Sequence, residues 1–214
     1  MQYNSIPPAP QLEPFVKHIE VITSGASMQS ETNLRFFADG CPGIIFSQSE
    51  SGFFTDACSD KLCSFYLYGQ TIKPINIFSF GRFTKIIFYL KPHVLGSLFR
   101  INASEITDTC LDISLLLPKL TPELLEKLSE TTSIQNQIRL ISDFLVFIAE
   151  KNNPDLMLQL ATEKIIRRNG EISLTELQKE FSLSERTFER RFENSIGVSP
   201  RLFSRVCRFQ SALA

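Results

Sequence analysis

The first half of the chain consists of short apolar runs separated by turn-forming residues. Aromatic and β-branched residues dominate four runs, at 43–46, 64–68, 75–78 and 84–90, and glycine, proline, serine and aspartate lie between them. Turn signals at intervals of about ten residues are typical of an antiparallel sandwich or barrel. Residues 1–14 contain four prolines, which predicts an extended or polyproline arm.

Helical periodicity replaces this pattern after residue 118. Thr121, Pro122 and Glu123 read as a helix start, with Thr121 as the N-cap, and a second helix is expected from about Ser133 to Glu150. The aliphatic residues of this second helix are spaced 4-3-4-3 in a heptad seam: Ile134, Ile138, Ile141, Leu145 and Ile148. The seam is shorter than the three or four heptads that indicate a coiled coil. We therefore favour packing against its own domain, with a dimer contact as the alternative.

A change in composition at Asn152-Asn153-Pro154 indicates the start of a further segment. A helix is expected over 155–168, with Leu156, Leu160 and Ile165 facing inward. The predicted organisation is therefore a β-rich domain at 1–118, a helical connector at 119–153 and an all-α domain at 154–214. The fold class is α+β.

Two helices joined by a short turn follow within the last segment. Ser173 and Glu176 form a capping box for the first of these helices, and Ser184 is a good N-cap for the second. Phe188 and Phe192 fall on one face of the second helix. Arg186 and Arg190 fall on the opposite face. A tight turn followed by a helix with a cationic outer face is typical of a helix-turn-helix unit.

Three motifs in residues 156–214 resemble the DNA-binding domain of AraC/XylS-type transcription regulators. They are S-x-R-T-x-x-R-x-F from Ser184, G-V-S-P from Gly197 and R-x-x-R-F-x-x-A from Arg205. The resemblance implies a sequence-specific regulator that binds double-stranded DNA with the second helix in the major groove. That family normally has two such units joined by a long helix, so we expect the domain to be incomplete here, ending within the joining helix.

The resemblance also implies which side chains meet DNA. Base reading is expected from Arg186, Glu189 and Arg190, because arginine can bond to guanine and glutamate can accept from cytosine. Backbone contacts are expected from Ser184, Thr187, Arg191, Arg201 and Arg205. The alternative is that the arginines and glutamates form ordinary surface pairs on a helix. Two positions depart from the family pattern: Gln178 stands where a small residue is usual, and Ser182 stands where the turn usually has glycine.

The β-rich segment is similar, more loosely, to the jelly-roll-like sensor domains of such regulators. The similarity rests on Phe88-Tyr-Leu-Lys-Pro-His93 and the residues that follow. It implies a small-molecule effector or a homodimer contact in this domain, and RNA polymerase as a further partner. The competing hypothesis is a ligand-sensing or protein-interaction module whose DNA-binding unit is vestigial.

Charge and composition narrow the function classes. The net charge is −1, but residues 161–214 hold ten Lys/Arg against seven Asp/Glu, a basic excess where DNA binding is expected. The two histidines are 75 residues apart and no nucleophile or phosphate-binding motif occurs, so we expect no enzyme, no catalytic residue, no metal and no cofactor. Five cysteines without CxxC spacing, no signal peptide and no long apolar stretch favour a cytoplasmic protein.

Overall fold

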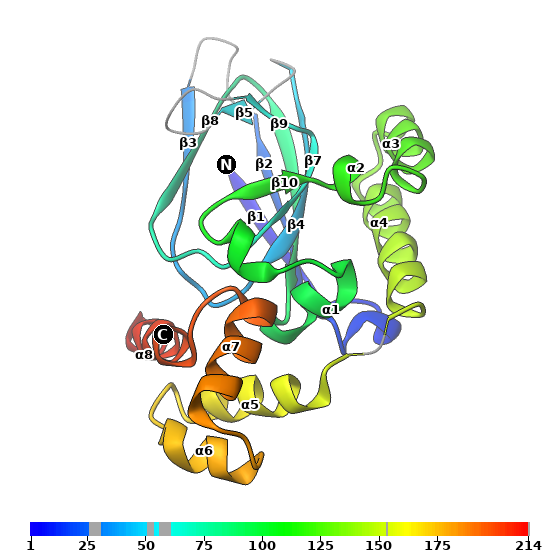
Figure 1. Ribbon diagram of the computed structural model, residues 1–214. Coiled ribbons are helices and arrows are strands. Elements are labelled where there is room, and N and C mark those ends of the chain that lie inside the picture. The colour runs from blue at the N-terminus through cyan, green and yellow to red at the C-terminus, as the bar shows by residue number, and fades with distance from the viewer. Residues whose placement is uncertain (26–30, 51–53, 56–60, 153, 214) are drawn as a thin grey trace.

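The computed structural model describes residues 1–25, 31–50, 54–55, 61–152 and 154–213 (Figure 1). Ten strands in these ranges form two antiparallel sheets. The larger sheet has six strands in the order β1 (Gln2–Ile6), β2 (Val16–Ser24), β9 (Phe83–Leu90), β4 (Gly43–Ser49), β7 (Phe65–Tyr68) and β10 (Cys110–Asp112). The smaller sheet has the order β3 (Glu31–Phe36), β8 (Ile75–Phe80), β5 (Phe54–Thr55) and β6 (Lys61–Leu62). The four predicted runs thus lie in β4, β7, β8 and β9.

Residues 2–6 are extended, as predicted for the N-terminal arm, but they are part of a sheet and not a separate arm. These residues form β1, which pairs antiparallel with β2 from Gln2 opposite Thr23 to Ile6 opposite Ile19. An open sheet edge offers unpaired backbone groups to any extended segment, whatever its side chains. The strand stops where Pro7 and Pro8 follow, since proline cannot donate to the ladder.

Helices follow the strands and flank them. They are α1 (Leu95–Phe99), α2 (Ile113–Leu116), α3 (Thr121–Glu130), α4 (Ile134–Ala149), α5 (Leu156–Arg167), α6 (Leu174–Glu180), α7 (Glu185–Ile196) and α8 (Pro200–Leu213), with 3-10 turns η1 (Pro10–Leu12), η2 (Pro92–Val94) and η3 (Ala103–Ile106). In Figure 1, α3 and α4 lie along one side of the sheets, and α5 to α8 gather at one end of them. The expected N-cap at Thr121 is one residue late: Leu120 is the N-cap, and the buried Thr121 hydroxyl donates to the Leu117 carbonyl.

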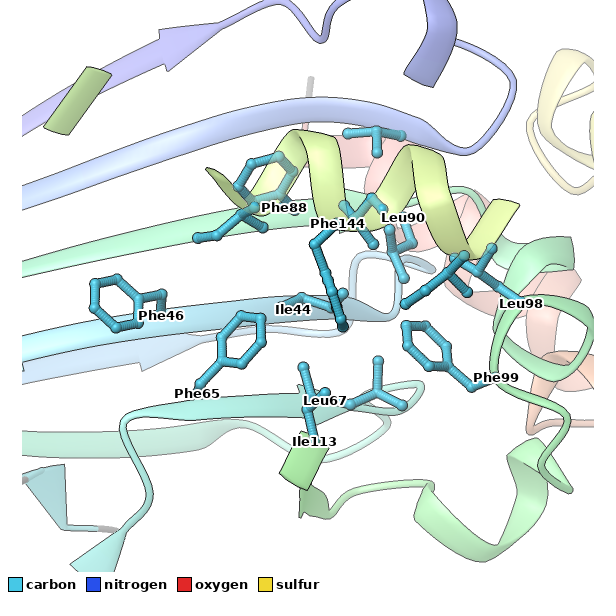
Figure 2. Packing of buried hydrophobic residues seen from close by; sticks show 14 of the residues in the cluster. Ile44, Phe46, Phe65, Leu67, Phe88, Leu90, Leu98, Phe99, Ile113 and Phe144 are labelled. Atoms are coloured by element: carbon cyan, nitrogen blue, oxygen red, sulfur yellow. The ribbon is translucent and has the colours of Figure 1, made fainter. Parts of the chain in front are cut away.

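The main core lies between the six-stranded sheet and α4 (Figure 2). Phe144 of α4 meets the Phe65 ring of β7 edge to face, with the ring centroids 6.0 Å apart. The seam residues of α4 belong to this core, where Ile141, Leu145 and Ile148 are buried. Packing against its own domain is therefore confirmed for this helix. A dimer contact through its remaining surface stays a prediction.

Side chains on the other face of β9 point between the two sheets. Phe83 and Ile87 lie in a second core with residues of the smaller sheet, whereas Ile86 and Phe88 belong to the main core. A third core holds α5 to α8 together. The α+β class is confirmed, with two antiparallel sheets. The jelly-roll or barrel character of the β-rich part stays a prediction, as do the domain boundaries after residues 118 and 153. Asn153 and Ala214 lie outside the described residues.

Candidate nucleic-acid interface

The turn between α6 and α7 has the geometry of a Schellman motif. The amide of Leu183 donates to the Gln178 carbonyl at 3.2 Å, and the amide of Ser182 donates to the Lys179 carbonyl at 3.0 Å. This motif requires a left-handed residue after the helix, and Ser182 has φ 53°. The serine therefore occupies the position where the resemblance calls for glycine, as the sequence predicts. The other departure, Gln178, is buried against its neighbours.

Capping fixes both ends of α7. The Ser184 hydroxyl accepts from the Thr187 amide at 3.3 Å and lies 2.9 Å from the Thr187 hydroxyl. At the other end Gly197 has φ 98°, and its amide donates to the Glu193 carbonyl. Both caps agree with the sequence prediction. The hydroxyls of Ser184 and Thr187 bond to each other, so a phosphate oxygen would compete with that bond.

Aromatic packing holds α7 against the other helices. Phe188, Phe192 and Ile196 are fully buried. The ring of Phe192 lies 5.8 Å from the rings of both Phe188 and Phe203, the latter on α8. These apolar residues occupy one side of α7 only, so its opposite side is left for polar residues.

The predicted base-reading residues all lie on exposed surface. Arg186, Glu189 and Arg190 are exposed on α7. With about 100° per residue, Arg190 lies roughly 160° around the helix from the midpoint of the buried stripe, Arg186 roughly 120° and Glu189 roughly 60°. Arg190 therefore projects most directly away from the protein, and Glu189 lies nearest the edge of the packed face.

Among the predicted backbone contacts, Arg191 already has a partner. Its Nε and Nη2 donate to Oδ2 of Asp155, at 2.9 and 2.7 Å. Asp155 is also the N-cap of α5, because its Oδ1 accepts from the amides of Met157 and Leu158. Sequence analysis did not identify this clamp, although an aspartate directly before an apolar helix is a recognised N-cap signal. Arg201 and Arg205 are exposed on α8.

The inward face predicted for α5 is wrong in part. Ile165 is fully buried, but Leu156 is 67% exposed and Leu160 is 49% exposed. Leu158 and Ala161 are buried instead. These two residues share a face with Ile165 at spacings of three and four, and the N-cap at Asp155 is consistent with that register.

The end of α7 is held against the β-rich part of the chain. The Thr107 hydroxyl donates to the Gly197 carbonyl at 2.6 Å, and Gly96 of α1 lies so close to α7 that a Cβ there would be 3.0 Å from the Ser195 Cα. Helix α7 thus packs against η3 and against α1, the helix nearest its upper end in Figure 1. No pattern in the sequence signals this contact between distant residues.

A cavity of about 410 Å³ lies between the two sheets. Its walls are mainly aromatic and aliphatic, with Asp39 and the hydroxyls of several tyrosines among the polar groups. Lys85 of β9 is fully buried nearby, where its Nζ donates to the Tyr66 hydroxyl at 3.2 Å and lies 4.2 Å from the centre of the Phe54 ring. Burial lowers the pKa of Lys85 to about 7. The sequence pattern, a β-branched and aromatic run, does not distinguish this lysine from a solvated one.

His93, expected at the surface or in a cap, is buried. It lies in η2 with 2% of its surface exposed, and burial lowers its pKa to about 4. It borders a second cavity, of about 370 Å³, between the sheets and α5 and α8. Within the described ranges, no three histidine, cysteine or acidic side chains are grouped to hold a metal, and no helix is long and apolar enough to span a membrane. Of the five cysteines, Cys58 lies outside the described residues.

Comparison with family models matches residues 4–112 to a domain of unknown function, DUF6597. This match covers half of the chain. The chain belongs to the DUF6597 family. The DUF6597 region extends from within β1 to the end of β10, so it includes both sheets and the cavity between them. The helix-turn-helix lies beyond the matched residues.

Three solved structures are distantly similar to this DUF6597 protein. ToxT from Vibrio cholerae has 12% identity over 91% of this chain and 81% of its own, with a TM-score of 0.42. Wild-type ToxT with a bound unsaturated fatty acid has 16% identity over 91% and 79%, with a TM-score of 0.43. The AraC-like transcriptional activator CuxR has 14% identity over 99% and 87%, with a TM-score of 0.31. Comparison with curated protein sequences gives no match.

Proposed function

We propose that this protein is a sequence-specific DNA-binding transcription regulator in which the DUF6597 region senses a small effector. The observation that carries the proposal is the geometry of α7. A Schellman turn and two caps position this helix, Phe188 and Phe192 anchor one side, and Arg186 and Arg190 stand exposed on the other. The motifs of AraC/XylS-type regulators coincide with these elements.

The exposed side chains suit the two tasks of a DNA reader. Arginine can donate two hydrogen bonds to guanine in the major groove, which fits Arg190 and Arg186, and Glu189 can accept from cytosine. Ser184, Thr187, Arg201 and Arg205 would bond to phosphates and set the register. Arg191 would join them only by leaving Asp155, so we expect its contribution to be smaller.

The remaining partners follow from the family resemblance. The cavity of about 410 Å³ between the sheets has the size of a small-molecule site and supports effector binding. We further propose a homodimer, contact with RNA polymerase and action in the cytoplasm. We assign no enzymatic activity and no cofactor.

Selection from a random pool of DNA duplexes, followed by affinity measurements over a salt series, tests the proposal. A DNA reader should enrich a sequence, and its affinity for random DNA should fall steeply with salt. Arg190→Ala should cost about 1–3 kcal/mol on the selected site and little on random DNA. Arg139→Ala, at an exposed position on α4, is the matched control and should bind like the wild type.

Two outcomes would contradict parts of this proposal. A loss in Arg190→Ala that is equal on all sequences would make Arg190 a phosphate contact. Binding that does not respond to salt, with no enriched sequence, would reject the DNA reader and favour a sensing or interaction module.

A further inference from the structure

The cavity between the sheets contains a carboxyl group, that of Asp39, which has no ion-pair partner among the described residues. Asp39 lies in the segment between β3 and β4, and it borders the cavity between the sheets as well as the cavity beside α8. Its Oδ1 accepts from the Cys41 amide at 2.8 Å. Among the described residues, no lysine, arginine or histidine forms an ion pair with it: the nearby Lys17 directs its Nζ to the Cys41 sulfur. Burial raises the pKa of Asp39 to about 6, although the hydrogen bond from the Cys41 amide and the nearby Lys17 ammonium act in the opposite direction.

Two of the hydroxyl-bearing residues that line the same cavity have side chains unengaged by the described residues. Tyr68 and Thr71 line it, and neither side chain has a hydrogen-bond partner in the described part of the chain. The side-chain amide of Gln70 donates to the Gly40 carbonyl at 3.0 Å, which ties the Gln70–Thr71 segment to the Asp39–Gly40 segment. A carboxylate and two hydroxyls can accept the three hydrogens of an ammonium group.

Aromatic rings supply most of the remaining wall. Among the described residues, the rings that line the cavity are those of Phe36, Phe37, Tyr66, Tyr68 and Tyr89. Ring faces attract cations, and the attraction grows when water is excluded. The molecule already shows this preference, since the ammonium of Lys85 lies over Phe54 beside the Tyr66 hydroxyl.

An anionic ligand fits these groups less well. Lys85 is not among the described residues that line the cavity, and its Nζ is engaged with Tyr66 and Phe54. Asp108 also borders it and accepts from two backbone amides. Lys61 also lines the cavity. Because its ammonium group could attract an anion, an anionic probe is included in the test below.

We propose that the cavity between the two sheets binds a small organic amine as a cation, with the ammonium group against Asp39 and an apolar body among the aromatic rings. This inference rests on the proposed effector-sensing function and names the chemical class of the effector. The position of Asp39 also connects the site to the DNA reader. The neighbouring Ala38 carbonyl accepts from Gln210 of α8, and Gly40 packs against Phe203 of α8.

Calorimetric titration of the full chain with three probes that share a phenethyl group tests the proposal. The probes are phenethylamine, phenethyl alcohol and hydrocinnamate, which carry a positive charge, no charge and a negative charge. We expect phenethylamine to bind about tenfold more tightly than the alcohol and hydrocinnamate to bind most weakly. Equal binding of amine and alcohol, tighter binding of hydrocinnamate, or binding of none of the three would overturn the proposal.

Variants assign the preference to the site. Asp39→Asn keeps an oxygen to accept from the Cys41 amide, so it should fold, and it should lose the preference for the amine over the alcohol. Tyr68→Phe should reduce the preference without abolishing it. Asp143→Asn, at an exposed position on α4, should leave it unchanged. A preference that survives Asp39→Asn places the amine elsewhere and rejects the site.

DNA binding separates this inference from the proposed function. The wild type and Asp39→Asn should bind DNA with the same salt dependence when no amine is present. Loss of the amine preference with DNA binding intact supports the site alone. Amine binding by a chain that does not bind DNA would reject the transcription regulator while leaving the amine site in place.

Discussion

Ser182→Gly should stabilise the protein. The substitution acts at the left-handed residue of the turn between α6 and α7, where Ser182 has φ 53°. A side chain in this region costs roughly 1–2 kcal/mol, because Cβ crowds the backbone carbonyl oxygen. Glycine removes that cost but adds roughly 0.5–1 kcal/mol of backbone entropy to the unfolded chain. The Ser182 side chain is exposed, and no hydrogen bond of its hydroxyl would be lost among the described residues.

The midpoints of these two ranges leave a net gain in unfolding free energy of about 0.75 kcal/mol, or roughly 1.5–3 °C in melting temperature for a chain of this length. Thermal and urea unfolding of the two proteins measure it. Asn194→Gly is the control: Asn194 is exposed within α7 and has helical backbone, where glycine is the poorer helix former and should lower the stability slightly. An unchanged or lower stability of Ser182→Gly would mean that the turn is not held in the left-handed conformation.

Three further predictions concern the packing of α5 to α8 and the buried histidine beside the sheets. Gly170→Ala should destabilise the protein by at least about 2 kcal/mol, because Gly170 has φ 76° and a Cβ there would lie 2.0 Å from the Ser204 carbonyl oxygen. The control in urea unfolding is Gly25→Ala, where an added Cβ would meet no atom of the described residues within 4 Å. Asp155→Ala should lower the free energy of unfolding by about 1–2 kcal/mol, because it removes the N-cap of α5 as well as the half-exposed ion pair with Arg191. Arg191→Ala removes only the ion pair and should cost less than about 1 kcal/mol. Equal costs for the two variants in a double-mutant cycle would show that the cap contributes little. His93 has its pKa lowered by burial to about 4, so the unfolded chain takes up a proton first and the wild type loses stability as the pH falls from about 6.5 to about 4. His93→Gln should remove up to about 3 kcal/mol of that loss, and parallel pH profiles of the two proteins would show that His93 does not carry it.

The local elements of the helix-turn-helix were predictable because their signals act over a few residues. Ser184 caps α7 and Gly197 ends it, as a serine before an apolar stripe and a glycine after it indicate. The left-handed residue of the turn, Ser182, stands where the family resemblance places a glycine. The strand positions in β4, β7, β8 and β9 followed from runs of aromatic and β-branched residues.

Long-range packing decided the features that the sequence analysis missed. Residues 2–6 became a strand because β2 presents an open edge, and Leu156 faces outward because the other helices contact a different side of α5.

The sequence by itself therefore determined the helices, the turn and the outward arginines of α7, since capping and amphipathic periodicity are properties of neighbouring residues. Tertiary structure alone decided that Arg191 is paired with Asp155, that Lys85 and His93 are buried, and that Asp39 borders a cavity without a cationic partner among the described residues. The environment of a polar side chain depends on residues far away in the chain, and a linear pattern carries no record of them.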